Sequence, residues 1–345
     1  MSDLTEVAQA RVAIVLVNWN GWRDCIECID SVLVQAQRNF HIFIVDNDSG
    51  DGSIDQIAAW CAAPEADPNW RRQHGVDRYT DQPVRSGVQY RVVDRSDRGV
   101  PPADDGCRVT LIRSGGNLGF AGGCNVGIRA AGLDDFAYFW FLNPDTVVDR
   151  LALVELIARA ERQPRMGIVG STLLFYDAPD TVHALAGGRL NRLNASSSHI
   201  GEHSLLSAVP SDASAVEREL AFVCGASMLV TTPFIRQIGL MQEDYFLYYE
   251  EVDWAMRGID HFQLGFARQS HVFHKSGANS SKIMPLFTAG VFYRSRLRFV
   301  SRFLPDRMAA AKRQLFVEML RHIARGRWGM ARVVGLTLLA PLKPT

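Results

Sequence analysis

The sequence predicts an α/β protein with a mostly parallel β-sheet that is flanked by helices and followed by a helical C-terminal extension. Over the first 150 residues, short apolar runs rich in β-branched residues alternate with segments of helical period, which is typical of a parallel sheet covered by helices. From about residue 291 the chain is basic and helical in pattern. With 345 residues, of which 47% are hydrophobic, the chain can bury a full core.

Charge, cysteine content and apolar runs limit the function classes. The chain has 37 Lys and Arg residues and 37 Asp and Glu residues. It therefore lacks the excess of positive charge that would indicate nucleic-acid binding. The acidic N-terminus argues against a secretory signal, and no apolar run reaches the roughly 20 residues needed to span a bilayer. Six scattered cysteines favour a reducing compartment over a disulfide scaffold. We therefore expect a cytoplasmic protein.

The first expected strand, Val12–Val17, is followed by a turn that contains Asn18 and by a helix that carries Cys25 and Cys28. The two cysteines share a helix face with neighbouring apolar residues. No second pair of cysteine or histidine residues follows nearby, as a zinc site would require. Packing of both cysteines in the core is therefore favoured over zinc or redox chemistry.

The second expected strand, Ile42–Val45, leads directly into a polar turn that begins at Asp46. This turn either caps the following helix or forms part of a ligand site, because open α/β sheets bind ligands beyond the carboxyl ends of their strands. Residues 61–108 are rich in Pro, Asp, Arg and Gly and have little periodicity. We expect them to form a long surface insertion.

The third expected strand, Val109–Ile112, precedes a glycine-rich turn that contains Asn117 and Gly119. The turn matches neither the dinucleotide fingerprint nor a P-loop. Its glycines either let the backbone approach a phosphate or ribose at a helix N-terminus, or let the helix pack closely on the strand. The fourth expected strand, Tyr138–Leu142, ends in the turn 143–145, which has the sequence Asn-Pro-Asp.

Polar clusters thus follow three successive expected strands, at 46–51, 117–125 and 143–145. Parallel strands present their carboxyl ends on one edge of a sheet, so the three clusters should converge there. A single cluster would indicate a helix cap. Three clusters at one edge predict a nucleotide site.

The second half of the chain is more mixed, with a helix expected near 150–162 and strands near 168–174 and 221–230. The stretch DYFLYYEEVDWAMRG places Glu250, Glu251 and Asp253 among aromatic residues. Adjacent like charges near apolar rings should raise the pKa of at least one carboxylate, which suits a general base.

His271 and His274 end another apolar run, in the stretch HVFHKSGAN. Histidines at such positions are most often buried and hydrogen-bonded within the core.

Seven segments together resemble the inverting family 2 glycosyltransferases of the GT-A fold, especially the bacterial branch with rhamnosyltransferases of cell-surface polysaccharides. They are VLVNWNGW, IVDNDSGDGS, GGNLGFAGGCNVGIR, FLNPDTVVD, GASMLV, YFLYYEEVDWAMR and VFHKSGAN, and they occur in the family's order. The resemblance covers about residues 11–300. It implies a GT-A domain over 11–290, with a nucleotide-binding half up to about 150 and an acceptor half over 151–290, and a separate C-terminal region over 291–345.

The resemblance also implies roles for residues of the donor site. Asp46 matches the carboxylate that contacts the nucleotide base, and Asn18 lines the same pocket. Asn117 and Gly119 lie in the nucleotide-contacting loop. Asn143 stands where the family's DxD motif has its first Asp, and it is expected beside the nucleotide sugar.

Asp145 matches the second carboxylate of the motif, which binds a divalent metal, Mg²⁺ or Mn²⁺, bridging the donor diphosphate. His274 resembles the histidine that completes this metal site. Glu250 and Glu251 occupy the place of the family's acidic pair, whose second member is the catalytic base. Glu251 stands where Asp is usual, and one extra methylene moves the carboxylate by about an angstrom, so Asp253 is the alternative base.

The implied reaction transfers a sugar from a nucleotide-diphosphate donor to a hydroxyl of a cell-surface glycan or lipid-linked acceptor, with rhamnose as the sugar of the nearest branch. The competing hypothesis is a non-catalytic nucleotide-sugar-binding or scaffold protein, motivated by the changes at Asn143 and Glu251. A nucleotidyltransferase is disfavoured because it has no obvious task for the EEVDW stretch or for His274.

The C-terminal region has closely spaced arginines and an apolar helix face. The arginines are Arg294, Arg296, Arg298 and Arg302, and the apolar face consists of Ala311, Leu315, Met319 and Ile323. Such helices either pack on the catalytic domain or rest on an anionic membrane surface, here the inner face of the cytoplasmic membrane.

Overall fold

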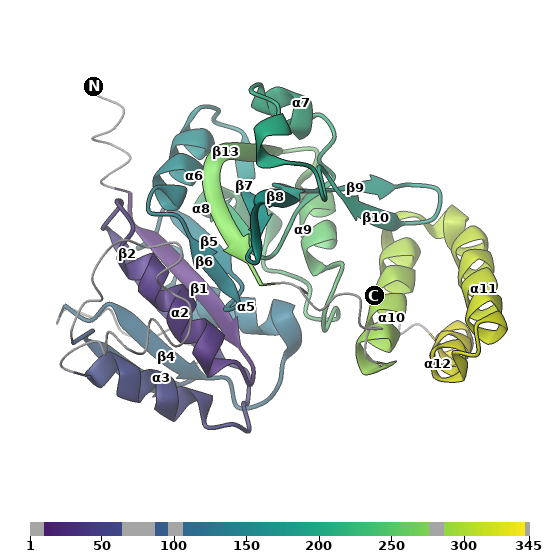
Figure 1. The fold of residues 1–345 in the computed structure, drawn as a ribbon, viewed down its shortest axis with the longest axis horizontal. Helices are drawn as coiled ribbons and strands as arrows, with labels where there is room; N and C mark the ends of the chain where they lie inside the picture. The colour runs from purple at the N-terminus through teal and green to yellow at the C-terminus, as the bar shows by residue number, and fades with distance from the viewer. Residues whose placement is uncertain (1–9, 64–86, 96–105, 276–285, 342–345) are drawn as a thin grey trace.

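The computed structural model describes residues 10–63, 87–95, 106–275 and 286–341. Its centre is a ten-stranded sheet with the order β3-β4-β2-β1-β5-β12-β7-β13-β6, in which β8 also pairs with β7 (Figure 1). The strands of this sheet are β1 (Val12–Asn18), β2 (Phe40–Asp46), β3 (Tyr90–Asp94), β4 (Val109–Arg113), β5 (Tyr138–Leu142), β6 (Thr146–Val148), β7 (Met166–Phe175), β8 (Ala178–Leu185), β12 (Ser227–Thr231) and β13 (Gln263–His274). A smaller sheet contains β9 (Gly187–Asn191), β10 (Ser196–His199) and β11 (Phe222–Val223).

Helices cover both faces of the large sheet. Those packed around it are α2 (Trp22–Leu33), α3 (Ser53–Ala62), α5 (Gly119–Ala131), α6 (Ala152–Glu161), α7 (Ala213–Glu217), α8 (Thr232–Ile238) and α9 (Glu250–Gly258). Apolar residues of α2, α3 and α6 share one core with Val12, Ile14 and Leu16 of β1. Residues of α5 and α8 share a second core with Ala13 and Val15. Successive side chains of a strand point to opposite faces, so β1 is buried between two helical layers.

Strand directions confirm the mostly parallel sheet predicted from the sequence. β1 pairs in parallel with β2 and β5, β2 pairs in parallel with β4, and β4 with β3. β12 runs antiparallel between β5 and β7. The carboxyl ends of β1, β2, β4 and β5 therefore lie at one edge of the sheet, as expected. Cys25 and Cys28 are buried in the core as free thiols, which confirms their packing role.

Two strand expectations need correction. Within the expected surface insertion over 61–108, Tyr90–Asp94 forms the edge strand β3; residues 64–86 and 96–105 lie outside the described part of the chain. An edge strand packs on one side only and tolerates charged residues such as Arg91, which hides its pattern in the sequence. The strand expected over 221–230 is divided between β11, in the small sheet, and β12, in the large one.

The C-terminal helices α10 (Leu286–Phe303), α11 (Met308–Ala324) and α12 (Trp328–Leu339) gather at one end of the molecule (Figure 1). They share a core with Tyr249 and Val252, at the start of α9 and within it. None of the helices in the described residues is both long and apolar enough to cross a membrane.

Candidate active site

Asn18 and Asp46 end neighbouring strands and are paired in register. The Asn18 amide donates to Asp46 Oδ1 at 3.1 Å and to Ser49 Oγ at 3.3 Å. Asp46 Oδ2 accepts from the Ser49 backbone N–H at 3.1 Å. Asp46 and Ser49 line a cavity of about 530 Å³ together with Arg95 and Arg113. Asn18 Oδ1 is buried and has no hydrogen-bond partner within the described ranges, so it is available to a ligand.

Asn47 joins the end of β2 to the glycine-rich turn, and the sequence analysis did not identify it. Its amide nitrogen donates to Asn117 Oδ1 at 3.1 Å and to the Gly119 carbonyl at 3.0 Å, and its Oδ1 accepts from Leu118 N–H at 3.0 Å. Asn117 Oδ1 in turn accepts from Gly119 N–H at 3.1 Å. The position of Asn47 at a strand end between two aspartates was the signal that could have identified it.

Of the two roles that the sequence left open for the glycines after β4, the structure shows close packing of helix on strand. Gly119 has a φ of 72°, and a Cβ added there would lie 2.1 Å from the Phe246 carbonyl oxygen. Phe120 N–H donates to that same oxygen at 2.8 Å. Gly123 and Gly127 instead allow α5 to approach Val17 and Val15 of β1. Gly119 therefore ties the turn to the segment that precedes α9, and the other two permit close packing of helix on strand.

Asp145 and His274 come together although they are distant in the sequence. Asp145 follows β5 in the short turn before β6, and β6 pairs antiparallel with the end of β13, where His274 lies. His274 Nε2 lies 3.2 Å from Asp145 Oδ1, and Lys275 N–H donates to the Asp145 carbonyl at 2.9 Å. Burial raises the pKa of Asp145, but the hydrogen bond and charge of His274 outweigh it and leave this pKa below its usual value.

A carboxylate oxygen and an imidazole nitrogen at this separation fit a divalent cation, with Mn²⁺ more tolerant of the nitrogen than Mg²⁺. Asn143 contributes to the turn through its backbone: its N–H donates to the Ala226 carbonyl at 3.1 Å, and its carbonyl accepts from Thr146 Oγ1 at 2.7 Å. His271 lies three residues before His274 on β13, so its side chain points to the other face of the strand.

The acidic pair Glu250 and Glu251 opens α9 directly after two strained residues. Tyr248 and Tyr249 have φ values of 67° and 70°, a left-handed conformation that costs energy for bulky side chains. Tyr249 is held by its hydroxyl, which donates to the Ala195 carbonyl at 2.5 Å, and by its own carbonyl, which accepts from Asp253 N–H at 2.8 Å. Backbone strain of this kind is concentrated at functional sites.

Burial controls the protonation of this pair. Burial, reinforced by the charge of Glu251, raises the pKa of Glu250 well above its usual value. Burial also raises the pKa of Glu251 to about 7, although backbone N–H groups at the helix start oppose the shift. Oε2 of each residue is buried without a hydrogen-bond partner in the part of the chain that the structure describes. A carboxylate with a pKa near neutrality and an unpartnered oxygen suits a general base.

Asp253 is in a different environment. It is fully buried, and its two oxygens bind Arg257 Nε at 2.7 Å and Arg302 Nη1 at 3.1 Å. Arg302 comes from α10, so this ion pair ties α9 to the C-terminal helices.

The acidic pair and the Asp145 turn both lie close to the loop that leads into β12. Burial raises the pKa of the Cys224 thiol to about 12; a hydrogen bond with the Ala226 backbone opposes this shift, and the charges of Glu251, Asp145 and Glu250 add to it. Ala226, two residues further on, binds the backbone of Asn143. Helix α9, which begins with the acidic pair, packs against β11 just before this loop, so both groups adjoin the same segment.

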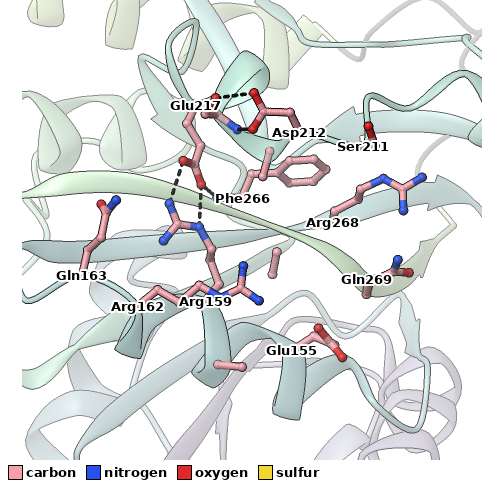
Figure 2. Close-up of a pocket in the computed structure, with 14 residues that line it drawn as sticks. Glu155, Arg159, Arg162, Gln163, Ser211, Asp212, Glu217, Phe266, Arg268 and Gln269 are labelled. Carbon is pink, nitrogen blue, oxygen red and sulfur yellow. Dashed lines mark hydrogen bonds and ion pairs between the residues drawn. The ribbon is translucent and has the colours of Figure 1, made fainter.

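A second hollow, of about 440 Å³, contains none of the predicted site residues (Figure 2). Arg159 lies in it and donates to both carboxylate oxygens of Glu217, at 2.7 and 2.6 Å. Glu217 Oε1 also accepts from Phe266 N–H at 2.7 Å. Because this partly buried pair is well satisfied within the protein, we assign it to structure.

A sequence model described as Glycosyl transferase family 2 matches residues 92–202, about a third of the chain. The low-salt glycan biosynthesis hexosyltransferase Agl10 of Haloferax volcanii is 25% identical over 192 residues, which are 54% of this chain. The match spans 59% of that relative's length.

Two solved structures are similar in fold. GalNAc-T7 with UDP, GalNAc and Mn²⁺ has a TM-score of 0.59 at 12% identity, covering 89% of this chain and 51% of the other. The mannosyltransferase PcManGT of Pyrobaculum calidifontis with GDP-Man and Mn²⁺ has a TM-score of 0.51 at 12% identity, covering 96% and 74%. The chain has a GT-A-like α/β fold, and the family match supports a glycosyltransferase domain.

Proposed function

We propose that this chain is an inverting, metal-dependent family 2 glycosyltransferase that uses a nucleotide-diphosphate sugar. The observation that carries the proposal is the 3.2 Å approach of Asp145 and His274 at the edge of a parallel sheet. The family match and the hexosyltransferase relative support the same reaction class, and the two structural neighbours contain Mn²⁺ and nucleotides.

In this proposal the donor lies across the carboxyl ends of β1, β2, β4 and β5. Asn18 and Asp46 contact the base and ribose beside the cavity that Asp46 lines. Asn117 and Gly119 approach the diphosphate, whose negative charge is favoured at the N-terminus of α5. Asp145 and His274 would hold Mg²⁺ or Mn²⁺, and such an ion would supply positive charge beside the leaving diphosphate.

Glu251 is the proposed base. Its carboxylate takes the proton of an acceptor hydroxyl while that oxygen forms a bond to the anomeric carbon and the bond from this carbon to the diphosphate breaks. One displacement inverts the anomeric configuration. Glu250 lies beside it in a buried position and contacts the donor sugar. We do not assign proton transfer to Asp253, because both of its oxygens bind arginines.

The acceptor in this proposal is a hydroxyl of a cell-envelope glycan or a lipid-linked sugar, and rhamnose is the first donor sugar to test. Arg296, Arg298 and Arg302 face the protein: Arg296 binds the Asn194 carbonyl, and the other two pair with Asp244 and Asp253. Ala311 and Leu315 also pack inward. These residues therefore do not form the membrane-facing side of the region over 291–345.

A membrane contact is instead proposed for the outer side of α11 and α12. These helices carry the exposed apolar residues Phe316, Leu320, Trp328 and Leu339. Arg313 and Arg321 lie on the same helix as Phe316. Their positive charges would be attracted to the anionic lipids of a cytoplasmic leaflet. Replacing both Phe316 and Leu320 by Ser should abolish sedimentation with anionic vesicles, whereas Leu151→Ser, at an exposed site on the main domain, should not. Equal sedimentation of all three proteins would refute the contact.

The function is tested by following release of nucleoside diphosphate from a panel of nucleotide sugars, with Mg²⁺ or Mn²⁺ and with or without a chelator. A lipid extract from cell envelopes supplies the acceptor. Metal-dependent release from one donor supports the proposal and identifies the sugar. Tight donor binding without release under all conditions refutes it, and indicates a binding or scaffold protein with a degenerate site.

A further inference from the structure

A histidine cluster lies beside the proposed metal pair and has no task in the reaction described above. His183 of β8 lies between two other imidazoles, with ring centroids 4.8 Å from His199 and 5.2 Å from His274. Glu202 follows His199 in the next turn, and its Oε1 lies 3.9 Å from His199 Nδ1. The ligand atoms offered by His183, His199 and Glu202 all lie within 4.8 Å of one another.

We propose that His183, His199 and Glu202 form a second metal site, selective for a nitrogen-preferring cation such as Zn²⁺, and that its occupancy weakens cation binding at Asp145 and His274. The second half of this statement rests on the proposed function.

The donor set and its exposure support the site. Two imidazoles and one carboxylate are the protein ligands of many open zinc sites, whereas Mg²⁺ prefers oxygen ligands. His183 is 8% exposed and fixes the inner end of the site, while the side chains of His199 and Glu202 are 28% and 43% exposed. An ion can therefore enter from solvent, and rotation of the Glu202 side chain can bring its oxygen within bonding distance.

The coupling follows from one shared hydrogen bond. His183 Nδ1 lies 3.4 Å from His274 Nδ1, so one proton must lie between these two nitrogens. When the Nε2 atom of neutral His274 binds a cation, its proton is on Nδ1, and His183 must accept it.

An ion on His183 removes that acceptor whichever nitrogen it binds. On Nδ1 the ion occupies the accepting lone pair. On Nε2 it leaves the proton on Nδ1, so His183 becomes a donor. In the second arrangement, His274 Nδ1 accepts a hydrogen bond from His183 Nδ1–H. His274 then carries its own proton on Nε2, the atom that faces Asp145.

The size of the effect can be bounded. Loss of a hydrogen bond that orients a metal-binding histidine typically weakens metal affinity by about 10- to 100-fold. We therefore expect Zn²⁺ to weaken Mn²⁺ binding at Asp145 and His274 by at least about tenfold.

The site is tested by Zn²⁺ titration of the full chain in an Asp145→Ala background, which removes a ligand of the other cation. We expect one bound Zn²⁺, with affinity lowered at least about tenfold by His199→Ala and by the exposed substitution Glu202→Gln. His203→Asn is the matched control, because this neighbouring histidine stacks on Phe175 and is not part of the ligand set. Equal Zn²⁺ affinity in all of these proteins would overturn the site.

The coupling is tested on the otherwise unmodified chain by measuring Mn²⁺ affinity with electron paramagnetic resonance, with and without Zn²⁺. In His199→Ala the effect of Zn²⁺ should disappear. If Zn²⁺ weakens Mn²⁺ binding equally in His199→Ala, it competes directly for Asp145 and His274, and the coupling is wrong. Neither measurement uses a sugar donor, so absence of glycosyl transfer would refute the proposed function without affecting the zinc result.

Discussion

Replacing Gly119 by Ala should disturb the acidic pair through a single backbone contact. An L-residue at the Gly119 φ of 72° costs about 1–2 kcal/mol. The added Cβ would also lie 2.1 Å from the Phe246 oxygen and would break the 2.8 Å hydrogen bond from Phe120, which contributes about 0.5–1.5 kcal/mol. The expected loss in the free energy of unfolding is therefore about 1.5–3.5 kcal/mol.

Gly326→Ala is the matched control. Gly326 follows α11 in a left-handed conformation with a φ of 68°, and nothing lies within 4 Å of an added Cβ, so only the conformational cost of about 1–2 kcal/mol applies. Urea denaturation of both variants at 25 °C gives the difference directly.

The functional consequence should separate the two variants further. Phe246 stands four residues before Glu250, so its displacement shifts the acidic pair. A shift of about an angstrom can lower the rate by about 100-fold, so Gly119→Ala should lose that much kcat/KM while Gly326→Ala keeps nearly all of it. Equal stability and equal activity of the two variants would show that the contact with Phe246 does not position Glu250 and Glu251.

The remaining predictions concern the base, the metal pair and the link from Asn47. Because the pKa of Glu251 is raised from 4.5 to about 7 in the folded protein, kcat/KM should rise with pH through about 7. The same shift should lower the stability of the wild type by up to about 3 kcal/mol as pH rises from 4.5 to 7, since the unfolded chain releases its proton first. Glu251→Gln should bind donor without turnover and should have a flatter stability profile; an unchanged rate would exclude Glu251 as the base. Asp145→Asn should weaken Mn²⁺ binding with little change in melting temperature, and unchanged Mn²⁺ affinity would contradict the metal role. Asn47→Ala should cost about 1–3 kcal/mol and weaken donor binding, as measured by urea denaturation and calorimetry, because it leaves the buried Gly119 carbonyl and the half-buried Leu118 N–H without their partner; a neutral substitution would contradict the linking role.

The parts of the fold with strong local patterns were predictable from the sequence. The strand Tyr138–Leu142 was predicted with its observed bounds, and Val109–Ile112 to within one residue, because buried parallel strands appear as continuous apolar runs. β3 was missed because it lies at an edge and carries charge.

Only those site residues whose side-chain type indicates their chemistry were predictable from the sequence pattern. Residue pattern suggested the carboxylates at the strand ends, whereas the assignment of His274 to a metal site came from the family resemblance. Hydrogen bonding across the fold could not be seen in the sequence: Asn47 binds residues 70 and more positions away, and His183 meets His274 only because β8 and β13 both pair with β7. The left-handed backbone at Tyr248 and Tyr249 was also unpredictable, because aromatic residues rarely adopt it.

The proposed metal site is tested most directly by a crystal structure with a nucleoside diphosphate and Mn²⁺, using anomalous scattering at the manganese edge to locate the ion. We expect a peak bonded to an Asp145 carboxylate oxygen and to His274 Nε2, with the nucleotide base beside Asp46. An ordered nucleotide with the manganese peak elsewhere, or without a peak at these two residues, would contradict it.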